Sequence, residues 1–204
     1  MRIRPVEYTG VSFRAPPLSS GLWFSEGLTI FYADALLRRA GVRTTGLTYE
    51  ARLATLIERY LGNSGATKLS AEVVSRAAYN AGPMALGDYN VSTHMQGELI
   101  GTMLNLIVRD ATNGARSMDD VMRTMYQRFT GRGFVSADVQ HAVESVCSCS
   151  IADFFAEHIT GASAFDFNHY LAPLGIRMNV TWQQAVDPQG KPSSDLRMWG
   201  WQAG

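Results

Sequence analysis

The sequence predicts a mainly helical fold with little or no sheet. Apolar residues recur at spacings of three and four through most of residues 22–172, which is the period of an amphipathic helix. Glycine, proline and helix-capping residues separate these stretches at short intervals. The alternation typical of a strand is found at 176–182. With 204 residues, 46% of them hydrophobic, the chain can build an ordinary globular core.

The charge balance argues against two classes of partner. Lys plus Arg and Asp plus Glu both number 18, so the sequence has no excess of basic residues for nucleic acid or an anionic membrane. The longest apolar stretch, 99–108, is too short to span a bilayer, which takes about 20 residues. No apolar stretch follows Arg2 and Arg4, so we expect a soluble chain without a signal peptide, either cytoplasmic or periplasmic.

The elements can be placed in chain order. Residues 1–21 form an irregular lead-in rich in proline, glycine and serine. Each expected helix then has a recognisable start or end. The expected helices are 22–40 before Gly41, 48–60 before Gly62, 70–81 before Gly82, 92–110 before Asn113, 117–129, 136–146, 151–158 and 166–172.

Two of these segments have distinctive features. The helix at 92–110 is apolar around most of its circumference, which is typical of a buried helix. Ser117 is expected to cap the next helix, with two aspartates in the first turn. Residues 1–178 form the predicted helical body and 179–204 a tail, which we expect to fray from Asp187 onward.

Cys147 and Cys149 lie two residues apart. A disulfide across so short a loop should be strained, and two thiols cannot complete a zinc site. We therefore expect two free thiols, at least one of them packed as a small hydrophobic residue.

One carboxylate stands out near the start of the first helix. Glu26 lies in an aromatic run that includes Trp23, Phe24 and Phe31, and a carboxylate buried there needs a cation, a metal or several hydrogen-bond donors. The alternative is an acidic residue in the first turn that simply complements the helix dipole. Asp34 is expected to be solvated or to pair with Arg38 one turn later; the alternative is a supporting role beside Glu26.

The segment Trp-x-x-Glu-Gly-x-Thr-x-x-Tyr at 23–32, followed by Asp34 and Leu-Leu-x-Arg-Ala-Gly, resembles the glycyl aminopeptidase family of gluzincin zinc metallopeptidases. The resemblance continues through 90–92, Gly97, 112–114, 117–122, 131–134, 153–155 and 170–175. It implies the helical C-terminal subdomain of a thermolysin-like catalytic domain.

In that family the glutamate of this motif is the third zinc ligand, which corresponds to Glu26 here. The other two ligands and the general base come from a His-Glu-x-x-His helix, which this sequence lacks. The family also carries a β-rich region upstream and a PDZ domain downstream, so 179–204 is expected to be the start of a truncated connection to that domain.

His94 occupies the position at which the family has a tyrosine that stabilises the oxyanion, three residues before Gly97. An imidazole can donate the same hydrogen bond. The alternative is an ordinary ion pair with Glu98, one turn further along the helix. His141, His158 and His169 are expected to be surface or internally satisfied residues.

Three functional hypotheses remain open at this point. The first is a fragment or truncated form of a zinc aminopeptidase that acts on N-terminal peptide bonds, has a peptide substrate when complete, and is inactive alone without stably bound zinc. The second is a non-catalytic homologue that serves as a binding module, with an exposed apolar face that would favour association with a partner or with a second copy. The third is a small enzyme with a metal held by Glu26, His94 and Glu98.

Overall fold

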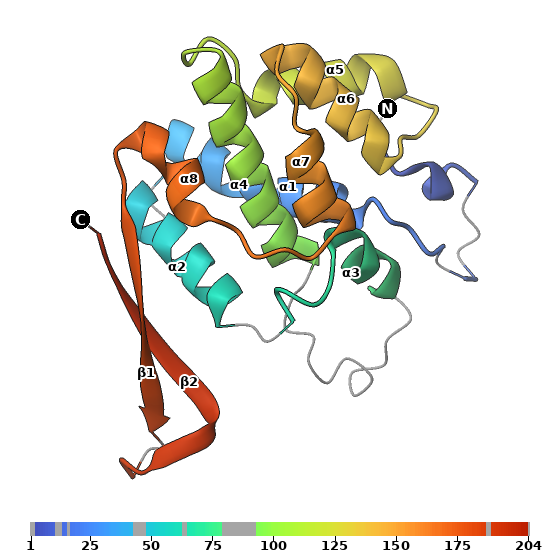
Figure 1. The fold of residues 1–204 in the computed structure, drawn as a ribbon. Helices are drawn as coiled ribbons and strands as arrows, with labels where there is room; N and C mark the ends of the chain where they lie inside the picture. The colour runs from blue at the N-terminus through green and yellow to red at the C-terminus, as the bar shows by residue number, and fades with distance from the viewer. Residues whose placement is uncertain are drawn as a thin grey trace. The chain divides into compact units, whose positions relative to one another are not determined.

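The computed structural model describes residues 3–10, 14–15, 17–42, 48–62, 65–78, 93–186 and 189–203. The chain divides into two compact units, residues 1–164 and 165–204. The first unit is helical and the second combines short helices with a hairpin (Figure 1). The predicted mainly helical class is therefore confirmed.

The first unit contains seven α-helices among its described residues. They are α1 (Leu22–Arg39), α2 (Tyr49–Leu61), α3 (Ala71–Ala77), α4 (Thr93–Ala111), α5 (Met118–Phe129), α6 (Ser136–Cys147) and α7 (Ala152–Phe155), the last continuing as a π-turn at Ala156–Thr160. A 3₁₀ turn, Val6–Tyr8, precedes them, and its first residue donates its backbone N–H to the Phe134 carbonyl over 2.9 Å.

Side chains cap α2, α3 and α5, and of these caps Ser117 was the one predicted from the sequence. The side chain of Thr48 accepts the backbone N–H of Ala51, and that of Ser70 accepts the N–H of Val73. Ser117 caps α5 in a capping box with Asp120. These side chains satisfy backbone donors that a helix cannot pair internally. The predicted helix at 70–81 ends at Ala77, and 79–92 lie outside the described residues.

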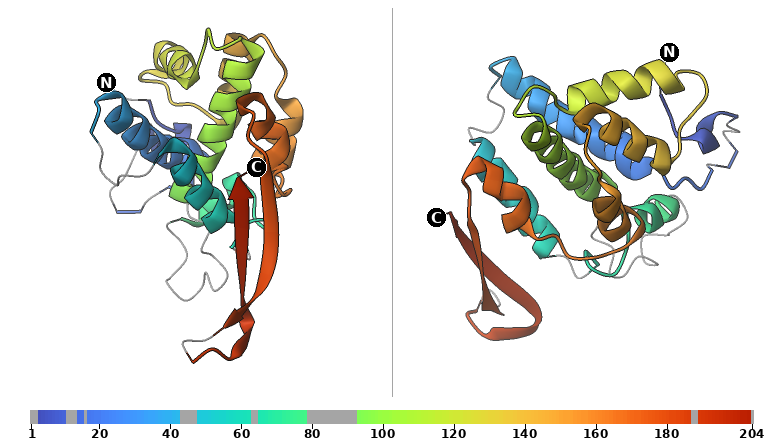
Figure 2. Two further views of the ribbon diagram at one scale, coloured as in Figure 1. Left: turned by 90° about the vertical axis from the view of Figure 1, so that its left-hand side faces the viewer. Right: turned by 45° about the horizontal axis from the view of Figure 1, so that its top comes forward.

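Helix α4 forms the centre of the first unit's core. Thirteen of its residues are buried, among them Leu99, Ile100, Met103 and Leu104 at 0% exposure. Helix α1 packs along α4 on one side, and the pair is adjacent in both views of Figure 2. Burial on most faces of α4 confirms the interpretation of its apolar sequence.

The second unit contains α8 (Phe167–Leu171), a 3₁₀ turn at Ala172–Leu174, and strands β1 (Met178–Val186) and β2 (Pro192–Ala203). The strands pair antiparallel with Met178 opposite Ala203 and an irregularity near Val186. The expectation that the tail frays was wrong, because residues 192–203 satisfy their backbone groups by pairing with β1. Asn168 ties α8 to the start of β1 through two hydrogen bonds with the Met178 backbone.

The expectation of two free thiols was also wrong. Cys147 and Cys149 form a disulfide. Ser148 between them takes a left-handed conformation, φ 54°, which folds the chain back and brings the two Cα atoms to 5.1 Å. That separation lies within the usual range for bridged cysteines. Cys147 is nevertheless buried, as expected, at 4% exposure.

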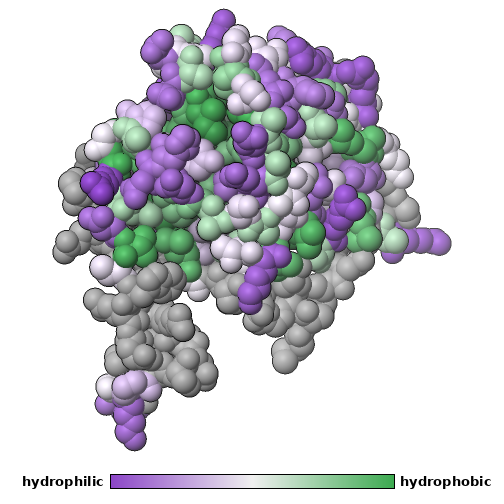
Figure 3. Space-filling model, viewed as in Figure 1, coloured by the Kyte–Doolittle hydropathy of each residue, from purple (hydrophilic) through white to green (hydrophobic). Residues whose placement is uncertain are grey.

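No helix in the described part of the chain is both long enough and apolar enough to cross a membrane. On the face that Figure 3 presents, hydrophilic side chains separate the apolar patches of the described residues.

Candidate functional site

Helices α1 and α4 cross at a pair of glycines. A Cβ added to Gly97 would lie 2.7 Å from the Cα of Gly27, and one added to Gly27 would lie 2.8 Å from the backbone nitrogen of Glu98. Only glycine allows two helix backbones to approach so closely. Because Gly27 directly follows Glu26 and Gly97 lies about one turn after His94, this crossing also sets the distance between those two side chains.

The crossing brings together the two candidate site residues. Nε2 of His94 lies 3.1 Å from Oε2 of Glu26, although the two residues lie far apart in the sequence. The side chain of His94 is 53% exposed and that of Glu26 is 37% exposed. The pair is therefore accessible to a ligand from solvent. A carboxylate with an imidazole beside it can bind a cation or exchange a proton.

Glu26 is less buried than its aromatic neighbours suggested. Trp23 and Phe24 are almost fully buried, and the Trp23 indole N–H donates to the hydroxyl of Ser136 over 3.3 Å. Successive helical residues point about 100° apart, so Glu26 faces His94 while those rings face the core. Glu26 is therefore not a carboxylate buried among these aromatic rings.

Glu98 pairs with a different residue from the one expected. Its Oε1 lies 2.5 Å from Nη2 of Arg52 on α2, and the glutamate side chain is 10% exposed. Nε of Arg52 is 3.8 Å from Oδ1 of Asp34, which is within ion-pair range but too far for a hydrogen bond. The expected pair between Asp34 and Arg38 is present at 2.7 Å. These charges tie α1, α2 and α4 together.

The arginine at position 52 was missed by sequence reasoning. Its place on the polar side of an amphipathic helix is typical of a solvated residue, and the sequence carries no signal of its distant partner Glu98.

The hypothesis of a metal held by Glu26, His94 and Glu98 is not supported. Across the described ranges, no group of three His, Cys, Asp or Glu residues is arranged to hold a metal ion. The close ion pair between Glu98 and Arg52 occupies the carboxylate that this site would need.

The other histidines fit the expectation of surface or satisfied residues. His141 and His169 are exposed. His158 is buried, with its side chain 1% exposed, and its Nδ1 lies 3.2 Å from the carbonyl oxygen of Ser163. Because a carbonyl only accepts, this hydrogen bond requires the proton on Nδ1. Burial lowers the pKa of His158, although the Ser163 carbonyl and the nearby Glu157 carboxylate oppose that shift.

An apolar groove of about 460 Å³ runs along another face of α1. Its lining is mostly apolar and comes from α1, α5 and the segments around Ile3 and Phe134; on α1 it includes Phe24, Leu28, Tyr32 and Leu36. A neighbouring hollow shares Ile3 and Met122 with it. Ser25, next to Glu26 in the sequence, also lines the groove.

The comparisons agree with the resemblance seen in the sequence. The M61 glycyl aminopeptidase family matches residues 1–100. A crystal structure of an aminopeptidase N family protein from Idiomarina loihiensis shares the fold, with a TM-score of 0.73 at 22% identity over 94% of this chain. This chain spans 34% of that structure. A comparison with curated proteins finds no match. The family match confirms the resemblance predicted from the sequence.

Proposed function

We propose that this relative of the M61 glycyl aminopeptidases is the helical part of a zinc-dependent aminopeptidase that hydrolyses N-terminal peptide bonds. The contact between the side chains of Glu26 and His94 supports the proposal most directly. The resemblance assigned a metal-binding role to one residue and an oxyanion-stabilising role to the other, and such roles require the two side chains to be neighbours. Their atoms lie 3.1 Å apart.

The donors in this chain fit one part of a zinc site. A catalytic zinc takes three protein ligands, and Glu26 supplies one carboxylate. The sequence has no His-Glu-x-x-His to supply the others, and the described residues offer no group of three. We therefore expect the chain by itself to bind zinc weakly and to be inactive. In the complete enzyme, zinc would polarise the attacking water and the scissile carbonyl.

Glu26 and His94 would position a metal ion and stabilise the oxyanion of the substrate. A carboxylate has two oxygens, so Glu26 can accept a hydrogen bond from His94 on Oε2 and offer its other oxygen to a metal. The same contact holds the imidazole in one orientation. His94 would then donate its other ring N–H, at Nδ1, to the oxyanion that develops on the substrate carbonyl, which requires both ring nitrogens to carry a proton.

An aminopeptidase assay on the native protein, purified at its natural length from its source, tests the proposal. Release of an arylamine from glycyl and alanyl arylamides should require metal and should be abolished by Glu26→Gln. His94→Ala should lower kcat by about 100-fold with a smaller change in KM, as expected for loss of one oxyanion donor. Glu72→Gln is the matched control, because Glu72 lies on α3 in a loose 4.0 Å pair with Arg76. It should retain full activity.

Two results would contradict this assignment. One is a native protein without aminopeptidase activity in the presence of zinc. The other is an active protein in which Glu26→Gln and Glu72→Gln have equal effects.

The apolar groove favours a second candidate function, a non-catalytic binding module. Leu36 lines the groove and is 56% exposed, so the apolar lining of the groove continues onto the surface, and a contiguous exposed apolar patch is typical of an association site. On this proposal the groove is an association surface, and a second copy of the chain covers it. The chain should then self-associate in solution whether or not it has peptidase activity.

A further inference from the structure

The disulfide between Cys147 and Cys149 closes a loop of very few residues between α6 and α7. A disulfide stabilises a protein mainly by restricting the unfolded chain, and the effect grows with loop length. A bridge across a single intervening residue therefore restricts very little. Stability alone does not explain why two cysteines stand here.

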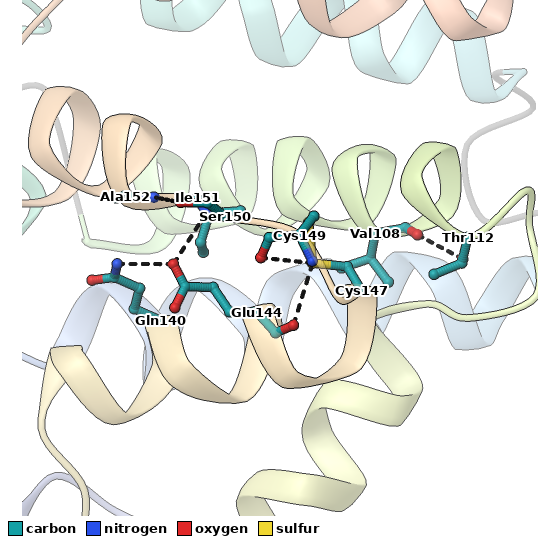
Figure 4. The surroundings of a disulfide bond; sticks show 9 residues. All are labelled: Val108, Thr112, Gln140, Glu144, Cys147, Cys149, Ser150, Ile151 and Ala152. Atoms are coloured by element: carbon teal, nitrogen blue, oxygen red, sulfur yellow. Dashed lines mark hydrogen bonds between the residues drawn. A yellow bond between two sulfur atoms is a disulfide. The ribbon is translucent and has the colours of Figure 1, made fainter.

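The two sulfurs differ in accessibility. Cys147 is 4% exposed, and Figure 4 places it beside Val108 of α4, which is fully buried. Cys149 is half-buried and stands between two exposed serines, Ser148 and Ser150. Attack on a disulfide requires access to one sulfur. The sulfur of Cys149 is the one that an incoming thiolate can reach.

The turn that carries the disulfide is also held by other bonds. Oε1 of Glu144 accepts the backbone N–H of Ile151 over 3.1 Å and an amide N–H of Gln140 over 3.1 Å (Figure 4). The backbone N–H of Cys149 lies 3.2 Å from the sulfur of Cys147. The glutamate thus connects α6 to the segment after the bridge without using either sulfur. Opening the bridge should leave the turn in place.

We propose that Cys147 and Cys149 form a site of reversible thiol–disulfide exchange whose co-substrate is a small or protein-borne dithiol. One thiolate of the dithiol attacks the sulfur of Cys149, forms a mixed disulfide there and expels the thiolate of Cys147. The N–H of Cys149 lies within hydrogen-bonding distance of that leaving sulfur. The second thiolate of the co-substrate then attacks its own bridged sulfur and releases Cys149. The protein gains two electrons and two protons, and the co-substrate becomes a cyclic disulfide.

Equilibration of the 204-residue chain in dithiothreitol redox buffers tests this inference. Acid quenching, alkylation of free thiols and intact mass spectrometry count the reduced cysteines, and far-ultraviolet circular dichroism reports the fold. The oxidised fraction should follow the buffer ratio reversibly as a single two-electron step. The helical signal should stay unchanged in both forms.

Two single variants test the difference between the sulfurs, with oxidised glutathione as the probe. Cys147→Ser keeps the accessible thiol and should form a glutathione adduct. Cys149→Ser keeps the buried thiol and should react at least ten-fold more slowly. The inference is overturned if the native chain carries two free thiols after equilibration in air-oxidised buffer. It is also overturned if the bridge resists reduction until the chain unfolds, or if both variants react at the same rate.

Discussion

The backbone of Gly27 on α1 lies directly against that of Gly97 on α4. A side chain of any size at either position would overlap the opposite helix. This contact places Glu26 and His94 within 3.1 Å of each other. The packing of the core and the geometry of the candidate site therefore depend on the same two residues.

Gly97→Ala should destabilise the first unit strongly. Its Cβ would overlap the backbone of α1, which cannot move aside as a flexible side chain can. We expect a loss of about 3 kcal/mol in the free energy of unfolding, at the upper end of overpacking effects. Urea denaturation followed by circular dichroism measures it.

Gly101→Ala is the matched control, one turn further along α4. A Cβ there would lie 3.2 Å from Cδ2 of Leu28, at the mobile end of a side chain. Alanine is also the better helix former by about 1 kcal/mol, so the net change should be within about 1 kcal/mol of zero. Equal losses in the two variants would refute the glycine contact.

Arg52→Leu should cost about 2 kcal/mol of stability, because it leaves the carboxylate of Glu98 buried without its cation. The double variant Arg52→Leu with Glu98→Leu should recover most of that loss, since no charge then remains buried. Thermal denaturation of the unchanged chain, Arg52→Leu, Glu98→Leu and the double variant gives the coupling free energy between the two residues. Arg76→Leu is the control, because that arginine is 62% exposed and its pair should contribute less than about 0.5 kcal/mol. Additive effects at positions 52 and 98 would show that the pair is not coupled.

Stability should fall as the pH drops below about 6.5, the ordinary pKa of histidine. Burial lowers the pKa of His158 in the folded chain, so over this range the unfolded chain binds a proton that the folded chain does not. Stability therefore rises with pH through this window and is lost on acidification. His158→Asn should reduce the slope of stability against pH in chemical denaturation between pH 7 and pH 5. Exposed His141→Asn should retain the slope; if it abolished the slope instead, His158 would not be the source.

Leu36→Asp should weaken self-association if the groove along α1 is covered by a second copy. The substitution puts a charge into the apolar lining. Sedimentation velocity over a range of concentrations should show a lower average mass for this variant than for the unchanged chain. Val73→Asp, at a similarly exposed apolar residue on α3, should have no effect. A chain that is monomeric throughout would contradict the binding-module proposal.

The helical framework was predictable because its signals are local. Thr48, Ser70 and Ser117 precede apolar periodic segments, and each side chain accepts a backbone N–H at its helix start. A capping residue and a period need only a few neighbouring positions. Gly131 and Gly133, which follow the end of α5, both take positive φ, the conformation that glycine adopts most readily.

The features that sequence reasoning missed depend on contacts between distant residues or on one backbone conformation. Glu98 was expected to pair within its own helix, but tertiary packing brought Arg52 from α2 to it. The bridge at Cys147 depends on the left-handed conformation of Ser148, which a non-glycine residue seldom adopts. Glu26 and His94 could each be singled out by resemblance, whereas their pairing required the glycine crossing.

The intact mass of the native protein, purified from its source, tests most directly whether this chain is part of a zinc aminopeptidase. We predict a mass well above 22.4 kDa, with upstream peptides that contain His-Glu-x-x-His. A native mass of 22.4 kDa would contradict this prediction, because the cell would then make a helical chain without the other two zinc ligands.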